Sequence, residues 1–182
     1  MNKKIKLSLV TTFFLFSLSS LAASFFDLKG TSIEGKPVNF NDYKGKTILV
    51  VNIASQCGYT PQLTDLENLY QKFKAKNFVL IGFPTNDFGG QTPENDTQMK
   101  DFCSRKYNVT FPLMKKAEVL GAKRQDVYRF FSELKDKKLN GDVKWNFEKF
   151  LINKEGSVVE RFGSSVKPLD QELTKVIESN LK

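Results

Sequence analysis

Apolar residues along the chain form short continuous runs, separated by stripes at helical spacing. The runs at 47–53 and 78–83 are rich in β-branched and aromatic residues, which predicts strands buried on both faces. Between them a helix is predicted over about 62–74, with an apolar face made of Leu63, Leu66, Leu69, Tyr70 and Phe73. A strand, a helix and a second strand in this order predict a right-handed parallel βαβ unit.

Further elements are predicted on both sides of this unit. Upstream, the segments 25–30 and 36–39 flank a turn and predict a small β-hairpin. Downstream, a breaker-rich loop at 84–93 leads into a helix predicted over about 94–107. The inward stripe of that helix is formed by Met99, Phe102 and Cys103.

The last third of the chain adds a helix, a hairpin and a closing helix. A helix is predicted over about 125–135, and an antiparallel hairpin joins 150–153 to 157–162. The closing helix carries Leu169, Leu173, Val176 and Ile177. This order of elements predicts the α/β class and a thioredoxin-like fold, in which helices flank a central mixed β-sheet and an N-terminal β-hairpin precedes it.

Residues 1–23 have the pattern of a secretory signal peptide. Three lysines precede a largely apolar stretch at 7–18, and small residues follow at 19–23. We expect cleavage after Ala22 or Ala23, which leaves a single domain at 24–182. The alternative is an uncleaved anchor, but the apolar stretch is short for a span of about 20 residues. The chain is therefore expected to be exported, to the periplasm.

The net charge of the chain bears on whether it could bind nucleic acid or a membrane surface. The net charge of +8 falls to +5 when the three lysines of the signal peptide are removed. No aromatic-interleaved basic motif supports nucleic-acid binding. The favoured interpretation is a solvated basic surface, and weak attraction to an anionic membrane surface is also consistent with the charge.

The candidate chemistry lies in two cysteines, Cys57 and Cys103, in a chain without histidine. The absence of histidine excludes His-based triads and His-containing zinc or haem sites, and no cofactor is expected. Cys57 follows the first buried strand, in a turn near a helix N-terminus. Backbone N–H groups and the helix dipole favour a thiolate there.

Neutral donors are expected to support that thiolate. Gln91 lies in the loop after the second strand, and Trp145 and Asn146 precede the later hairpin. Since the ends of parallel strands share one face, the loops that follow the two buried strands can meet. The structural alternatives are Trp145 as a core residue and Gln91 and Asn146 as turn formers.

An accessible thiolate that attacks a peroxide becomes a sulfenic acid, which a second thiol can convert into a disulfide. Cys103 lies 46 residues beyond Cys57, so the two do not form a Cys-x-x-Cys motif. If Cys103 is on the inward face of its helix, that helix must loosen, because bridged Cα atoms lie within about 7 Å. The alternative is an inert buried thiol.

Three segments, 52–60, 83–91 and 145–151, resemble the signature blocks of the glutathione peroxidase family in sequence, order and spacing. The resemblance implies a thioredoxin fold and reduction of hydrogen peroxide and organic or lipid hydroperoxides. It implies that Cys57 is the peroxidatic residue and that Gln91, Trp145 and Asn146 complete a catalytic tetrad. The segment 102–113 resembles the one that holds the resolving cysteine in thioredoxin-dependent members, which assigns that role to Cys103.

Departures from the family pattern refine these expectations. Thr85 stands where many relatives have Cys, and Asp87 where many have Gln. The segment 137–143 is shorter than in tetrameric, glutathione-using relatives. This favours a monomer with an open active-site face, and a thioredoxin-like reductant over glutathione.

Four other functions compete with this prediction. A thiol–disulfide oxidoreductase is disfavoured because Thr60 occupies the place of the second Cys in a Cys-x-x-Cys pair. A peroxiredoxin is disfavoured because its Pro-x-x-x-Thr-x-x-Cys pattern is missing around Cys57. A peroxide sensor that passes its disulfide to a client protein shares the first chemical step. A structural module with an inert Cys57–Cys103 bridge is the last alternative.

Overall fold

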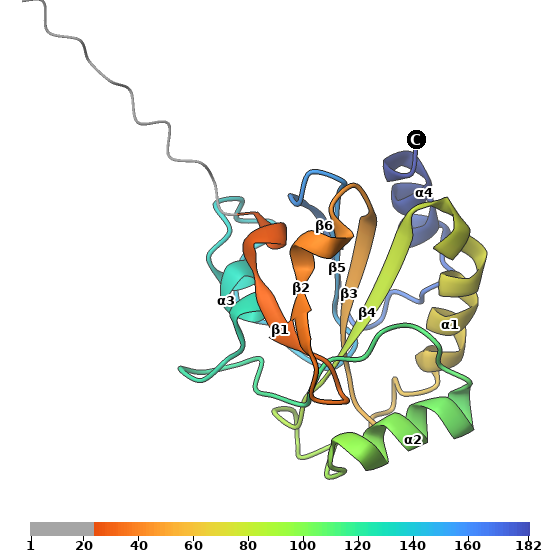
Figure 1. Ribbon diagram of the computed structural model, residues 1–182, viewed down its shortest axis with the longest axis vertical. Coiled ribbons are helices and arrows are strands. Elements are labelled where there is room, and N and C mark those ends of the chain that lie inside the picture. The colour runs from red at the N-terminus through yellow and green to blue at the C-terminus, as the bar shows by residue number, and fades with distance from the viewer. Residues whose placement is uncertain (1–23) are drawn as a thin grey trace, which may run out of the picture.

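The computed structural model describes residues 24–182. Its centre is a four-stranded mixed sheet with the strand order β4-β3-β5-β6 (Figure 1). The strands are β3 Thr47–Ile53, β4 Phe78–Pro84, β5 Lys149–Ile152 and β6 Val158–Phe162. β3 pairs in parallel with β4, and the pairs β3–β5 and β5–β6 are antiparallel. This confirms the βαβ unit, the later hairpin and the thioredoxin-like architecture.

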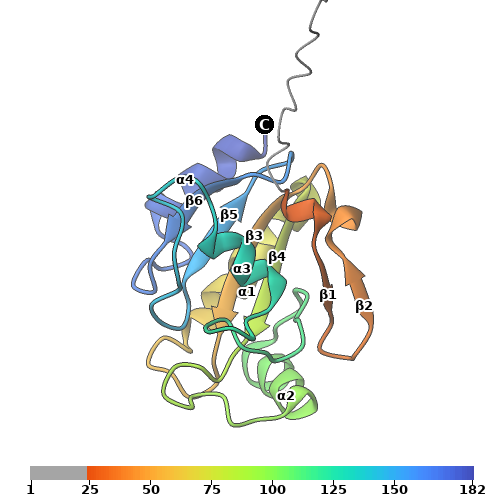
Figure 2. The same ribbon diagram turned by 90° about the vertical axis from the view of Figure 1, so that its left-hand side faces the viewer.

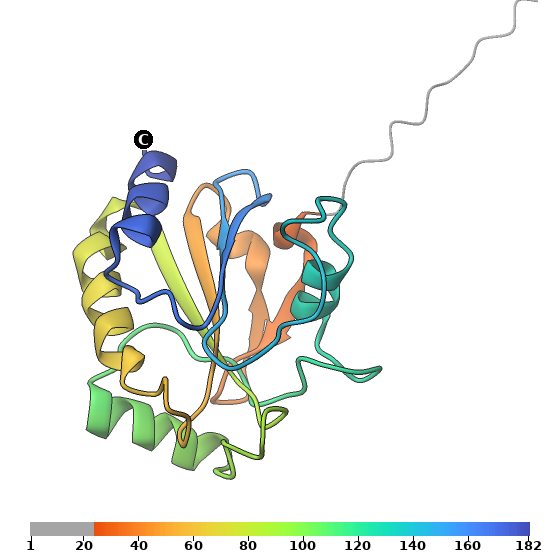
Figure 3. The same cartoon turned by 180° about the vertical axis from the view of Figure 1, so that it is seen from behind.

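The helices occupy both faces of the sheet and one end of it. α1 (Gln62–Phe73) and α4 (Gln171–Asn180) cover one face (Figure 3), and α3 (Asp126–Ser132) lies over the other (Figure 2). α2 (Asp96–Tyr107) lies across the end of the sheet at which β3 and β4 finish. A short 3₁₀ helix, Lys74–Lys76, extends α1.

The core consists of two apolar layers, one on each face of the sheet. Leu49 and Val51 of β3 enter the layer under α1 and α4, whereas Ile48 and Val50 enter the layer under α3. This alternation follows from the period of two along a strand. Cys57 belongs to the first of these layers.

The N-terminal hairpin is shorter than predicted. β1 (Lys29–Thr31) pairs with β2 (Pro37–Asn39), but Phe25–Asp27, predicted to begin the first strand, form a 3₁₀ helix. The reason is local, because Ser24 and Asp27 form a capping box that closes this turn and buries Phe25 and Phe26. A second 3₁₀ helix, Phe40–Tyr43, follows β2.

Three helix ends differ from the predicted ones. α2 begins at Asp96 instead of 94, because Asn95 caps it through the N–H of Gln98. α3 ends at Ser132 instead of 135, where the N–H of Glu133 reaches two carbonyls of the preceding turn. Leu169 was assigned to the closing helix but is exposed and precedes α4.

The predicted signal peptide at 1–23 lies outside the described residues. From Ser24 to the end of the chain, no helix has the length and apolar character needed to cross a bilayer.

Candidate active site

Three chain segments meet at the end of the sheet beside α2. β5 runs antiparallel to β3 with Val51 opposite Lys149, so the residues before β5 lie beside those that follow β3. The loop after β4 also reaches this point, since the N–H of Gln56 donates to the carbonyl of Gln91 at 2.9 Å. The expected meeting of the loops after the two parallel strands is thus confirmed.

Cys57 lies in a tight turn between β3 and α1. Its N–H donates to Thr60 Oγ1 at 3.0 Å, and that hydroxyl donates to the carbonyl of Ala54 at 2.9 Å. The N–H of Tyr59 points at Cys57 Sγ, 3.4 Å away. Thr60 therefore closes the turn at the position that a second cysteine would occupy in a Cys-x-x-Cys motif.

Asn146 and Gln91 form a direct contact between two of the three segments. Asn146 Nδ2 donates to Gln91 Oε1 at 3.0 Å, and the Asn146 side chain is fully buried. Asn146 Oδ1 accepts no hydrogen bond from any described residue. Residues 145–147 form a corner of the chain just before β5. This corner is fixed to β3, because Asn52 Nδ2 donates to the Trp145 carbonyl and the Phe147 N–H donates to the Asn52 carbonyl.

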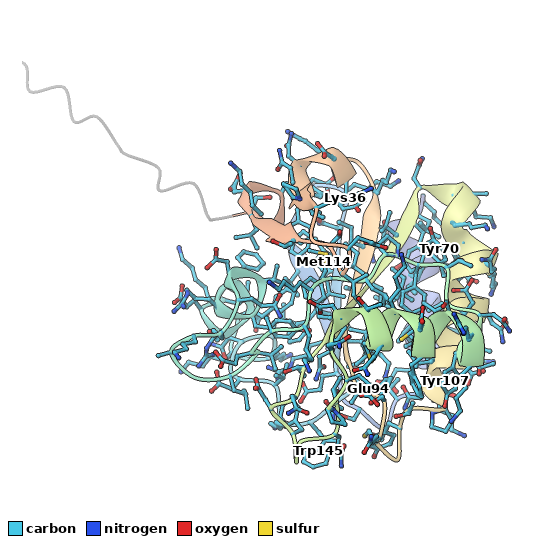
Figure 4. The ribbon with its side chains drawn as sticks, turned by 60° about the horizontal axis from the view of Figure 1, so that its bottom comes forward. Lys36, Tyr70, Glu94, Tyr107, Met114 and Trp145 are labelled. Carbon is cyan, nitrogen blue, oxygen red and sulfur yellow. The ribbon has the colours of Figure 1, made fainter. Side chains whose placement is uncertain are left out.

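Trp145 lies at the rim of this site, not in the core. Its side chain is 40% exposed and rests against the ring of Phe88, with the centroids 5.6 Å apart. Figure 4 shows it at the edge of the face that α2 and Glu94 also border. The alternative that Trp145 is a core residue is therefore wrong. Together with Tyr59, which is 36% exposed, it gives the site an apolar rim.

The three predicted donors do not hydrogen-bond to the sulfur in this structure. Across residues 24–182, the hydrogen bond to Cys57 Sγ comes from the Tyr59 backbone, not from Gln91, Trp145 or Asn146. The prediction from helix-terminus geometry thus accounts for the observed donor. The three side chains lie at the same end of the sheet, where Trp145 is exposed, Gln91 is half-buried and Asn146 is buried.

Cys103 lies on the inward face of α2, as its position on the apolar stripe predicted. It is fully buried, and both cysteines are free thiols. Burial, with a smaller contribution from the Glu94 carboxylate, raises the pKa of Cys103 to about 12. The thiol is therefore protonated and shielded while α2 remains folded.

Glu94 was missed by the sequence analysis. Its carboxylate accepts hydrogen bonds from the Ser55 hydroxyl and from Gln56 Nε2, both in the Cys57 turn. Lys116 Nζ in turn donates to the carbonyls of Thr92 and Glu94. These contacts join three loops, and no periodic pattern marks loop contacts in a sequence.

Two buried charges at the start of β5 were also missed. Glu148 accepts from the backbone N–H of Lys144 and from the guanidinium of Arg161, which is 2.7 Å away. Lys149, the next residue, is fully buried. A signal existed, because adjacent charged residues begin an otherwise apolar strand at 149–152, where charges are rare unless they are paired.

The two departures at 85 and 87 have structural roles. Thr85 is buried, so a cysteine at this position would also be buried. Asp87 Oδ2 accepts the N–H groups of Val119 and Leu120 at 2.6 and 3.0 Å, which fixes the segment that leads to α3.

Comparison with known proteins decides the family. The family model for glutathione peroxidase matches residues 25–132. The glutathione peroxidase-like peroxiredoxin 2 of Saccharomyces cerevisiae is 46% identical over 160 residues, which cover 86% of this chain and 99% of that protein. The chain belongs to the glutathione peroxidase family. Membership confirms the resemblance drawn from the three sequence blocks and makes the chain a peroxidase by class.

Two further proteins are similar to this chain over most of its length. The hydroperoxy fatty acid reductase gpx1 of Synechocystis is 42% identical over 149 residues, covering 79% of this chain and 88% of that protein. The crystal structure of Trgpx in its apo form superposes with a TM-score of 0.71 at 37% identity, covering 88% of this chain and 96% of that one. The thioredoxin-like fold is thereby confirmed.

Proposed function

We propose that the chain is a two-cysteine thiol peroxidase for hydrogen peroxide and for organic and lipid hydroperoxides. The observation that carries the proposal is the hydrogen bond between Asn146 and Gln91, which brings two loops together at the end of the sheet that holds the Cys57 turn. Cys57 is the nucleophile, and Gln91, Trp145 and Asn146 support the transition state.

The first step is attack of the Cys57 thiolate on the outer oxygen of the hydroperoxide. The S–O bond forms as the O–O bond breaks, and the leaving alkoxide or hydroxide takes up a proton to become an alcohol or water. The Tyr59 N–H stabilises the starting thiolate. The buried Asn146 amide donates to Gln91 Oε1 and so orients the Gln91 side chain, which is half-buried and can hydrogen-bond to the hydroperoxide.

The second step joins the two cysteines. The Cys103 sulfur attacks the sulfenic sulfur of Cys57, a disulfide forms, and water leaves. Because Cys103 is fully buried in α2, this helix opens before the bridge closes. A dithiol protein then reduces the disulfide by exchange and becomes oxidised itself.

The surroundings of Cys57 favour a protein reductant and bulky substrates. Tyr59 and Trp145 are exposed at the rim. A hollow of about 280 Å³ lies beside the turn, lined by Gly58, Tyr59, Pro61, Gln62, Asp65, Ser165 and Lys167. We assign the reductant role to a thioredoxin-like protein ahead of glutathione. The Synechocystis relative, a hydroperoxy fatty acid reductase, supports lipid hydroperoxides as substrates.

Export and a monomeric state belong to the same proposal. The signal peptide is cleaved after Ala22 or Ala23, and the mature enzyme acts in the periplasm with a periplasmic thioredoxin-like partner. The Ser24 N–H already donates to Asp27 Oδ2 at 3.0 Å, a contact that a newly freed amino group at Ser24 would keep. Mass spectrometry of exported protein tests the cleavage, since an intact Met1 would contradict it.

The decisive experiment is peroxide-dependent oxidation of a reduced thioredoxin-like protein. Several peroxides are compared, with glutathione in parallel. Cys57→Ser is expected to lose all activity, and full activity in this variant would refute the nucleophile. Cys103→Ser is expected to form the sulfenic acid but to lose turnover with thioredoxin, and unchanged turnover would refute the resolving role.

The same preparation separates the alternative functions. A thiol–disulfide oxidoreductase would reduce insulin without peroxide. A sensor would be trapped by Cys103→Ser as a mixed disulfide with one client protein.

A further inference from the structure

Lys149 is a buried cation next to the proposed catalytic corner. It opens β5 and is fully buried, on the strand face shared with Phe147 and Leu151. That face packs in the same apolar layer as Cys57. A lysine is rarely buried completely unless its ammonium has partners.

The partners of this ammonium are two backbone carbonyls from different segments. Lys149 Nζ donates to the carbonyl of Phe147 at 2.9 Å and to the carbonyl of Val166 at 2.6 Å. Phe147 directly follows Trp145 and Asn146. Val166 lies between Ser165 and Lys167, which form one wall of the hollow beside Cys57. One side chain therefore ties the Trp145–Asn146 corner to a wall of the substrate hollow.

The corner needs such a tie because its backbone is strained. Phe147 has a φ of 66°, in the left-handed region that side-chain-bearing residues rarely adopt. Its N–H is held by Asn52, and its carbonyl is held by Lys149. This conformation sets the direction in which the preceding Asn146 enters the site.

We propose that Lys149 is the positioning residue of the active site, which holds Asn146 and Trp145 and the wall at Val166 in register with Cys57. The inference rests on the proposed peroxidase function and adds a residue to it. Lys149 acts through the backbone and does not touch the substrate.

Charge on Lys149 strengthens the tie. An ammonium donates stronger hydrogen bonds than a neutral amine. Burial lowers the pKa of Lys149 to about 8, while Asp170 and Glu148 act in the opposite direction. Glu148 is itself paired with Arg161, so its charge is shared. The tie is expected to weaken as the pH rises through 8.

The test compares Lys149→Met with Lys154→Met. Lys154 is the matched control, because its ammonium also donates to two carbonyls, those of Leu181 and Lys182 at the C-terminus. For each protein, two second-order rates are measured with reduced enzyme: Cys57 with hydrogen peroxide and Cys57 with iodoacetamide. Both reactions need the thiolate, but only the first needs Asn146 and its neighbours, so their ratio reports positioning.

Lys149→Met is expected to lower the peroxide-to-alkylation ratio by about 10- to 100-fold, the range that a small misplacement costs. Trp145 is the single tryptophan, so its emission maximum is expected to shift as well. Lys154→Met is expected to change neither quantity. A ratio within twofold of wild type in folded Lys149→Met would overturn the proposal.

If Lys149→Met does not fold, the peroxide-to-alkylation ratio of the wild-type protein provides the test. This ratio is expected to fall at least twofold between pH 7 and pH 9.5, and a constant ratio would then overturn the inference. Failure of the proposed function has a different signature, because wild-type enzyme would then not react with peroxide at any pH.

Discussion

At the scale of single residues, Cys103 is held in a state opposed to the chemistry assigned to it. Resolution of a sulfenic acid requires a thiol that can reach Cys57, yet Cys103 is fully buried and its pKa is raised to about 12. Cys57 is also mostly covered, but a backbone N–H already points at its sulfur. Both thiols are buried in the same apolar layer, but a backbone N–H points only at Cys57 Sγ among the described residues, so Cys103 stays protonated and inactive while α2 remains folded.

Alkylation of the reduced protein tests this difference. At pH 8, iodoacetamide is expected to label Cys57 while Cys103 stays unlabelled, because a thiol with a pKa about 4 units above the pH has roughly 1 thiolate in 10⁴. Mass spectrometry of the modified peptides measures both sites. The control is the same reaction in urea, where both cysteines should be labelled. Equal labelling of the two residues in folded protein would contradict the buried state.

At the scale of elements, α2 is the part that must move, and its two ends are fixed differently. The N-terminal end has the Asn95 capping box. Beyond the C-terminal end, the buried carboxylate of Glu67 on α1 accepts the N–H and the hydroxyl of Thr110, and also Gln71 Nε2. Gln71 Nε2 also donates to the Thr110 hydroxyl at 2.8 Å, so this attachment is made by two residues of α1, of which Glu67 accepts from the backbone.

Glu67→Gln is expected to speed disulfide formation. The neutral amide makes weaker hydrogen bonds than the carboxylate, so the attachment weakens by about 1–3 kcal/mol and local opening becomes about 5- to 150-fold more frequent. The measurement is the rate at which the Cys57–Cys103 bridge appears after one equivalent of peroxide. Glu178→Gln is the matched control, since its pair with Lys72 is half exposed and contributes little. An unchanged rate in Glu67→Gln would show that α2 does not open from this end.

The elements were predictable where periodicity is strong, and the contacts between loops were not. The run at 47–53 and its partner strand gave β3 and β4 within one residue, because continuous apolar runs have few competing structures. Phe25–Asp27 were mistaken for strand because the capping box, not hydropathy, decides that turn. Cys57, Gln91 and Asn146 were found through turn position and family resemblance. Glu94 and Lys149 were not, since Glu94 pairs with side chains of a distant loop and Lys149 pairs with backbone carbonyls, and no sequence pattern marks either kind of contact.

At the scale of the whole molecule, Arg161 on β6 connects the loop 139–142 to the segment that leads into the active site. Its guanidinium pairs with buried Glu148 at 2.7 Å and donates to carbonyls of the loop 139–142. This loop is the short segment expected to leave the active-site face open. The same Glu148 carboxylate accepts the Lys144 N–H just before Trp145. Folding of the short loop and shaping of the site therefore depend on one ion pair.

Arg161→Met is expected to destabilise the fold by about 3–5 kcal/mol, because it leaves Glu148 as an uncompensated buried charge. Urea unfolding followed by Trp145 fluorescence measures the loss. Arg105→Met is the control, since the pair of Arg105 with Asp101 is largely exposed and should change stability by less than about 1 kcal/mol. A loss of that small size in Arg161→Met would mean that the loop holds its shape without the guanidinium.

Alkaline pH should destabilise the molecule through groups that are buried in neutral form. Burial raises the pKa of Cys103 to about 12 and raises the pKa of Tyr128 well above its ordinary value. The unfolded chain releases these protons near pH 9 and 10, while the native state retains them. The unfolded state then binds fewer protons, so the free energy of unfolding falls as the pH rises, by about 1.4 kcal/mol per pH unit for each group. The stabilisation is fully present below about pH 9.

Lys149 acts in the opposite direction over part of the same range. Its native pKa of about 8 is below the ordinary value, so between about pH 8 and 10.5 the unfolded chain binds the extra proton and stability rises with pH. The two effects are expected to offset each other near pH 9, and the loss then steepens above pH 10. Urea titrations from pH 7 to 11 measure this profile. Cys103→Ala and Tyr128→Phe should each flatten the alkaline fall, and Lys149→Met should remove the offset. A wild-type profile that stays level to pH 11 would mean that the native state lets these buried groups ionise.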